Sequence, residues 1–431
     1  MKTIMTSVYF KTFFDILIFS LILLLVSVMG GIGFEFAIGK TVISLHSFKN
    51  VLIFTLFIWI IKKIVGKGKI WHKTDLDFPV LIYLGTFIVA VLFSSQLKVS
   101  FLFFCYAFNC IALTYLLINN IDDKKKLEAV LFIIMISIVY VAARGTIQHI
   151  NTRLGYEDGN YYGFGGRAEF GAAIVLAIPI LISFLINYRK NSAAAIFFIS
   201  GLIILITGLI ASYSRGSWLA FIIVLLFLNF LYNNLLKKWR SFVLIILVFI
   251  LLFLVMPPGI KERIVSITDF THESNGDRIS IWKSSAKMIK DFPFFGTGPG
   301  TYDVYYPKYM QTELVGITYE VRKGIGWHAH NIFLHIASEN GIIGLTGYLL
   351  VIFVSYKKFF EIKALVKDTH LKNLLYGAMA SLTGYLACSQ STIFFANHNK
   401  NEKIAMFFWF DIALIFIVEN IIRKENNEKM I

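Results

Sequence analysis

The sequence predicts an all-α, polytopic integral membrane protein of about twelve transmembrane helices with one large extracytoplasmic loop. Composition is the first reason: 57% of the 431 residues are hydrophobic, 16% are charged, and the mean hydropathy is +0.71. A soluble domain carries about 45–50% apolar and about 25% charged residues. The second reason is that long apolar runs recur along the chain, and the third is that basic residues follow the positive-inside rule.

A helix needs about 20 mostly apolar residues to cross the hydrocarbon core of a bilayer. Such runs lie near residues 13–30, 49–66, 78–95, 99–119, 127–143, 170–187, 194–213, 216–235, 241–256, 330–356, 372–390 and 404–422. Residues 1–256 are therefore expected to hold nine helices and residues 330–431 three more. Between them, residues 257–329 form the large extracytoplasmic loop.

The formal net charge of +15 comes largely from short connections between these runs. If the N-terminus lies in the cytoplasm, the connections on that side are short and basic, and they hold Lys62 to Lys73, Lys124 to Lys126, Arg189 and Lys190, Lys237 to Arg240, and Lys357 to Lys372. The positive-inside rule therefore predicts that both termini are cytoplasmic. The charge indicates topology and does not call for a nucleic acid as partner.

Arginines collect on the predicted outer side, against the direction of that rule. They are Arg144, Arg153, Arg167, Arg215, Arg263, Arg278 and Arg322. A guanidinium suits phosphate because its planar fork donates two parallel hydrogen bonds. Arg215, in "SYSRGSW", sits in a tight connection between two apolar runs, where a charge is costly and is usually kept for a ligand or partner. The alternative is that these arginines only anchor the helices at the interface.

Histidines crowd the start of the tenth run, "GWHAHNIFLHIASENGIIGL". His330 is a candidate general base, since a neutral imidazole accepts a proton near pH 7. Glu339 shares a helical face with His335 and is expected to orient a histidine or a polar network. His328 and His335 are expected to be interfacial. A zinc site is the less favoured alternative, because the spacing is not the His-Glu-x-x-His pattern.

Two segments of the large loop have recognisable local patterns. The stretch from Asp277 to Gly296 predicts an amphipathic helix that lies on the bilayer, with an apolar stripe of Ile279, Trp282, Ala286 and Ile289. The following "GTGPGTY", residues 296–302, lacks the Gly-Lys-Ser/Thr ending of a phosphate-binding loop and predicts a turn.

These motifs together resemble the O-antigen ligase and polymerase superfamily over roughly residues 140–350. The resemblance consists of a tight Ser-Arg-Gly between two spans, a large outer loop, His330-Asn331, and then Glu339-Asn340-Gly341 with Gly344. The run "GGRAEFGAAIVLAIPI" is similar to an arginine-containing start of a middle span in that family.

The resemblance implies an inverting, metal-independent glycosyltransferase of the C-type membrane fold that needs no cofactor. It would work on the outer side of the inner (plasma) membrane and transfer a glycan from an undecaprenyl-pyrophosphate-linked donor to a glycan or lipid-core acceptor. His330 would be the catalytic histidine, Arg215 the pyrophosphate-binding arginine and Arg278 the arginine of the large loop. Further substrate contacts are expected from Arg167, Arg322, Asn331 and Glu339.

The sequence leaves the acceptor open, because ligation to a lipid core and polymerisation of repeat units use the same chemistry. A transporter or flippase of a lipid-linked saccharide is the competing class. Transporters tend to carry broken helices or polar residues at the middle of the membrane, often in matched halves. The strongly apolar spans and the single large outer loop favour the transferase.

Overall fold

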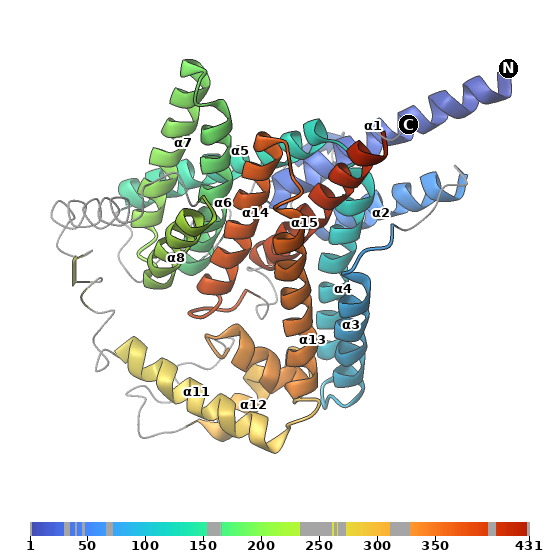
Figure 1. The fold of residues 1–431 in the computed structure, drawn as a ribbon. Helices are drawn as coiled ribbons and strands as arrows, with labels where there is room; N and C mark the ends of the chain where they lie inside the picture. The colour runs from blue at the N-terminus through green and yellow to red at the C-terminus, as the bar shows by residue number, and fades with distance from the viewer. Residues whose placement is uncertain are drawn as a thin grey trace.

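The computed structural model shows a helical bundle with two loop helices across one end (Figure 1). The structure describes residues 2–29, 35–38, 41–44, 48–65, 72–152, 164, 166–232, 261–262, 265, 273–310, 328–394 and 402–428. Arg322 and the predicted run at 241–256 lie outside these described residues.

The other eleven predicted runs coincide with helices. These are α1 (Lys2–Met29), α2 (Phe48–Val65), α3 (Asp77–Leu92), α4 (Leu97–Asn120), α5 (Lys124–Thr152), α6 (Arg167–Tyr188), α7 (Ser192–Ala211), α8 (Arg215–Leu231), α13 (Ile332–Ile362), α14 (Thr369–Cys388) and α15 (Glu402–Glu428). The described elements are helical, as predicted, apart from one short hairpin. Strands β1 (Glu35–Ile38) and β2 (Thr41–Ser44) form an antiparallel hairpin in which Ile38 pairs with Thr41.

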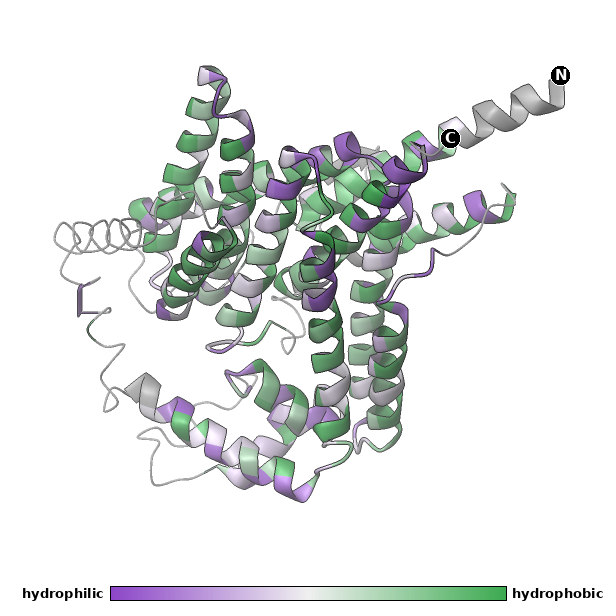
Figure 2. Ribbon diagram, viewed as in Figure 1, coloured by the Kyte–Doolittle hydropathy of each residue, from purple (hydrophilic) through white to green (hydrophobic). Residues whose placement is uncertain are grey.

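Seven of the described helices are long and apolar enough to cross a membrane: α1, α4, α5, α6, α7, α13 and α15. Helices α3 and α8 are apolar but shorter. Figure 2 shows these helices as mostly hydrophobic, with hydrophilic residues gathered at their ends. The chain is therefore an integral membrane protein, and the total of twelve spans stays a prediction.

The bundle is centred on α14, which packs against α6, α8 and α15. Helix α15 is almost wholly buried, and polar side chains of its neighbours bind it. The Thr114 hydroxyl of α4 donates to the carbonyl of Trp409 at 3.0 Å, and the Ser381 hydroxyl of α14 donates to the Asp411 carboxylate at 2.8 Å. Such hydrogen bonds and close packing hold helices together where no hydrophobic effect acts between them.

The far end of α13 carries an ion cluster. The ammonium of Lys358 lies 3.0 Å from Glu361 and 3.1 Å from Glu419, and it also pairs with Asp75, which precedes α3. Its hydrogen bond to Asp75 lowers the pKa of that carboxyl. The cluster ties α13, α15 and the start of α3 together at this end, because a buried ammonium is stable only when it is paired.

Two helices form within the predicted loop, α11 (Glu273–Asp291) and α12 (Tyr302–Tyr309). Helix α11 coincides with the predicted amphipathic helix, but the face that packs on the protein is a different one. Its buried side chains are Ser280, Ile281, Ser284, Ser285 and Met288. Two of the three serines are satisfied there, since Ser284 donates to the Tyr309 carbonyl at 2.9 Å and Ser285 bonds to the Tyr302 hydroxyl at 2.7 Å. The side chains of the predicted stripe, by contrast, are partly or wholly exposed, and Trp282 is 37% exposed.

Helix α13 bends at Gly341, and the segment that follows α11 binds inside the bend. Gly341 has a φ of 68°, which an L side chain rarely adopts. The amide of Ile342 donates to the backbone carbonyl of Pro293 at 2.8 Å. In the opposite direction, the amide of Thr297 donates to the Ser338 carbonyl at 3.0 Å, and that of Gly298 donates to the Glu339 carbonyl at 2.9 Å. The backbone groups freed by the bend are thus satisfied by the loop, as a break in a membrane helix requires.

The Glu339 carboxylate completes this junction. It is 5% exposed, and it accepts hydrogen bonds from the amides of Gly300 and Tyr302, each at 2.9 Å. His335, one turn earlier, lies 3.4 Å from the same carboxylate. The predicted turn at residues 296–302 is confirmed, because Gly296, Gly298 and Gly300 all have positive φ.

Replacing Gly341 with alanine is expected to destabilise the protein. The new β-carbon would lie 2.0 Å from the Phe294 carbonyl oxygen in a backbone conformation unsuited to alanine. The cost is about 2 kcal/mol or more. Thermal unfolding in detergent measures it, with Gly85→Ala as the matched control, because nothing lies within 4 Å of a β-carbon there. Equal melting temperatures for the two variants would contradict the proposed role of the bend.

Candidate functional site

His330 and Asn331 directly precede α13, and Asn331 caps the helix. Its side-chain oxygen accepts from the amides of Phe333 at 3.0 Å and Leu334 at 3.1 Å. Asparagine is among the best residues at this position because it satisfies amides that have no partner within the helix. Its side-chain nitrogen donates to Gln390, on the connection after α14, at 2.8 Å. The cap therefore also attaches α13 to that connection.

Two more contacts bind the start of α13 to residues 389–391. The amide of Ile332 donates to the Ser389 carbonyl at 2.9 Å, and Nδ1 of His330 lies 3.3 Å from the Ser391 carbonyl oxygen. A carbonyl only accepts, so this contact favours the tautomer with a proton on Nδ1 and the lone pair on Nε2. The His330 backbone has a φ of 50°, which histidine tolerates better than most residues.

Arg215 is the first residue of α8, as the tight connection predicted. Ser214 caps the helix by accepting from the amide of Ser217, and Arg215 is 6% exposed. The next residue, Gly216, packs on Ser391 so closely that a β-carbon on it would lie 1.8 Å from the serine hydroxyl oxygen. Ser391 therefore contacts both the start of α8 and His330, which brings Arg215 and His330 into one neighbourhood.

Arg167 is the first residue of α6, and the first turns of α6 pack beside the connection between α7 and α8. Gly171, one turn further along α6, packs against the hydroxyls of Ser217 and Ser212. The starts of α6, α8 and α13 and the ends of α7 and α14 thus meet at one end of the bundle. The ion cluster of Lys358 lies at the opposite end of α13.

Arg278 enters from the loop, on α11. Trp282, four residues later and on the same face of the helix, donates its indole N–H to the Ala329 carbonyl at 3.0 Å. Ala329 is fully buried between His328 and His330, whose ring centroids are 4.0 Å apart. This hydrogen bond therefore holds the Trp282 turn of α11 beside the histidine segment.

Arg278 and Arg215 lie near each other. Burial, and next the positive charge of Arg215, lower the pKa of Arg278, and the group stays charged at neutral pH. Within the described part of the chain, no carboxylate forms an ion pair with Arg278. Two neighbouring guanidinium groups repel each other, so an anion between them is favoured. The arrangement suits a phosphate or pyrophosphate.

The structure brings together His330, Asn331, Arg215, Arg278 and Arg167, and it gives two other residues different surroundings. The expectation that His335 is interfacial is wrong, because it is 2% exposed and lies against the Tyr302 ring at a centroid distance of 5.1 Å. The Glu339 carboxylate faces the loop junction and the His335 ring. Glu339 and His335 thus lie on the same face of the helix, as expected. Among the described residues, no three His, Cys, Asp or Glu side chains gather as a metal site would require.

Sequence reasoning missed Ser389, Gln390 and Ser391, together with Trp282 as a contact of the histidine segment. The only signal was the polar run "SQST" at the end of an apolar span, and nothing in its spacing relates it to a helix sixty residues earlier.

The fold and the site define an integral membrane protein that gathers arginines and a histidine at one end of its helices. The model of the O-antigen ligase family matches residues 200–349, which include Arg215, Arg278 and His330. This match confirms the resemblance seen in the sequence. An uncharacterized protein of Haemophilus influenzae is 26% identical over 262 residues, which are 57% of this chain and 62% of that relative. The alignment thus spans less than two thirds of that relative's length.

Replacing Gly216 with alanine is expected to disturb His330 through Ser391. The β-carbon would overlap the Ser391 side chain and displace its backbone, on which the histidine rests. The measurement is Nδ1 and Nε2 chemical shifts of selectively ¹⁵N-labelled histidine, read against a His330→Gln spectrum for assignment.

The double variant Gly216→Ala/Ser391→Gly is the control, because it removes the atoms that clash. Its His330 signals should return to those of Ser391→Gly alone. If Gly216→Ala leaves the His330 signals unchanged, the contact does not position the ring.

Proposed function

We propose that the protein is a glycosyltransferase that moves a glycan from undecaprenyl pyrophosphate to an acceptor hydroxyl, with inversion at the anomeric carbon. The observation that carries this proposal is the contact of Ser391 with both Gly216 and His330. That contact brings together a base and an arginine from distant parts of the chain, and both residues lie within the range that matches the O-antigen ligase family.

His330 acts as the general base. Its Nε2 lone pair accepts the proton of the acceptor hydroxyl while the hydroxyl oxygen forms its bond to the anomeric carbon. The bond from that carbon to the pyrophosphate oxygen breaks on the opposite side, and the lipid pyrophosphate leaves with the electron pair. The Ser391 carbonyl holds the Nδ1 proton and fixes the ring during this step.

Arg215 and Arg278 bind the pyrophosphate, and Arg167 supports them from the start of α6. Negative charge grows on the leaving oxygen as the glycosidic bond breaks, so guanidinium groups already in place stabilise the transition state more than the ground state. Partial burial strengthens this attraction. The arginines thereby supply the charge stabilisation that a metal ion supplies elsewhere.

Glu339 has a positioning role in this proposal. Its carboxylate holds Gly300 and Tyr302, and through them the loop that follows α11. It thus keeps Arg278 at a fixed distance from His330. The active site faces the extracytoplasmic side, and both termini are cytoplasmic, as the positive-inside distribution supports.

Alanine at His330 or Arg215 is expected to lower turnover by about a hundredfold or more. The assay uses purified protein in nanodiscs with a labelled undecaprenyl-pyrophosphate oligosaccharide and follows release of the lipid pyrophosphate. His328→Ala should have a mild effect. Arg215→Lys should recover only part of the activity, because a single ammonium cannot form the two parallel bonds.

Arg423→Ala is the matched control, since this arginine pairs with Glu419 at the other end of the protein. Activity should persist in the presence of a chelator. Full activity of His330→Ala would refute the general base. A donor that binds and crosses the membrane without being consumed would favour the flippase. A ladder of longer glycans indicates a polymerase, and a product that requires an added acceptor indicates a ligase.

A further inference from the structure

A cavity of about 460 Å³ lies between α5, α6 and α7, away from the candidate site. Its walls are mostly aromatic: Phe132, Phe184, Tyr188, Phe197 and Phe198. This volume is within the roughly 300–1,000 Å³ of small-molecule sites. All three helices are long and apolar enough to span a membrane, and Phe197 in the cavity wall is 50% exposed, so the cavity is open at the outer surface of these helices. It lies at the Tyr188 end of α6, whereas Arg167 begins the helix about 30 Å away.

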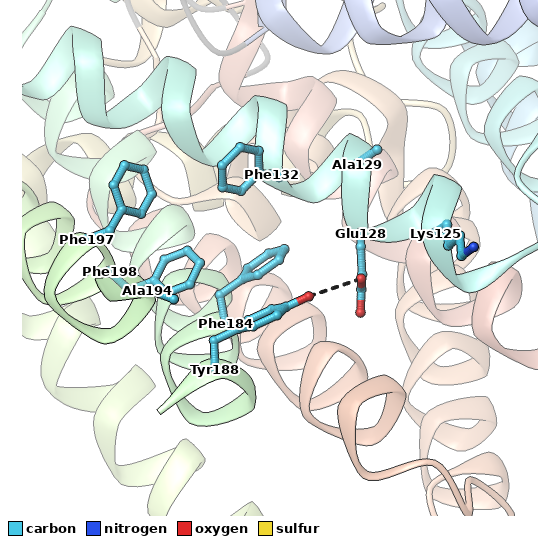
Figure 3. A pocket seen from close by; sticks show the side chains of 9 residues that line it. All are labelled: Lys125, Glu128, Ala129, Phe132, Phe184, Tyr188, Ala194, Phe197 and Phe198. Carbon is cyan, nitrogen blue, oxygen red and sulfur yellow. Dashed lines mark hydrogen bonds between the residues drawn. The ribbon is translucent and has the colours of Figure 1, made fainter. Parts of the chain in front are cut away.

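Figure 3 shows the cavity with an apolar and a polar side. The phenylalanine rings gather on one side, and Glu128 and Lys125 lie on the other. The Tyr188 hydroxyl donates to one Glu128 oxygen at 3.4 Å, and the second oxygen, Oε1, is buried. Within the described part of the chain, Oε1 has no hydrogen-bond partner. A buried carboxylate oxygen without a donor is costly, so a ligand that brings a donor would be stabilised here.

Lys125 differs from the lysines on either side of it. Lys124 pairs with Asp368 at 2.6 Å, and Lys126 pairs with Asp122 and Asp123. For Lys125, by contrast, the described residues provide no carboxylate within ion-pair distance, and its side chain is exposed at the edge of the cavity. Arg189 and Lys190 directly follow Tyr188 and are exposed as well. The edge therefore offers cations and one carboxylate beside an apolar cavity.

We propose that this cavity binds one phospholipid whose headgroup carries both a phosphate and a primary ammonium. An acyl chain lies against the phenylalanine rings, where its burial is favourable. The phosphate contacts Lys125, with Arg189 and Lys190 beside it, and the ammonium donates to Glu128. A headgroup with only negative charge would meet Glu128 unfavourably, and a quaternary ammonium could not donate a hydrogen bond to it.

Native mass spectrometry of the delipidated full chain tests this binding. The probes are phosphatidylethanolamine, phosphatidylcholine and phosphatidylglycerol with identical acyl chains. One phosphatidylethanolamine should bind about tenfold more tightly than phosphatidylcholine. Glu128→Gln should remove this preference but leave phosphatidylcholine binding intact, and Lys125→Ala should weaken all three lipids. Lys126→Ala, the paired neighbour, should bind like the wild type.

Ala194→Trp separates this cavity from the general lipid surface, because the indole fills space between the rings and should abolish the tight binding. The proposal is overturned if the wild type binds the three lipids equally, if phosphatidylglycerol binds most tightly, or if Ala194→Trp retains the preference. Far-UV circular dichroism confirms that each variant is folded. No glycan donor is present, so the result does not depend on the proposed transferase activity.

Discussion

The candidate site depends on one buried carboxylate. Glu339 accepts two backbone N–H groups from residues 300 and 302, and without these bonds its charge would be too costly to bury. The bonds attach the loop helices to the helix that begins with the histidine motif. Because Arg278 is on one side of this junction and His330 is on the other, their separation is set by a contact that neither of them makes.

The two ends of the helices use charge differently. At the Lys358 end, ammonium groups are matched with carboxylates that join α3, α13 and α15. At the other end, Arg278 and Arg215 are placed near each other instead. The ion pairs of Lys358 stabilise the bundle. The repulsion between Arg278 and Arg215 is tolerated where an anionic ligand relieves it. This contrast gives a physical meaning to the uneven use of lysine and arginine along the sequence.

Local patterns predicted the parts of this structure that depend on local physics. The apolar runs predicted the positions of the described helices, and Arg215 lies in the tight connection as expected. Contacts between distant segments could not be predicted in this way. The role of Ser391 depends on how α14 ends beside α8. The face of α11 that packs on the protein could not be predicted, because it contains three serines, and Tyr302 and the Tyr309 carbonyl satisfy two of them.

The bend at Gly341 also determines which part of the chain would have to be exchanged as a unit between related proteins. The first turns of α13 pack with α11 and α12, as Leu334 does against the small core of the loop helices. A graft of residues 257–329 alone would leave behind Glu339 and the backbone carbonyls that receive the loop. A segment that continues through residue 342 would include Glu339 and the backbone groups that bind the loop. Modular recombination in this fold is therefore expected to break the chain after the bend, inside what looks like an uninterrupted membrane helix.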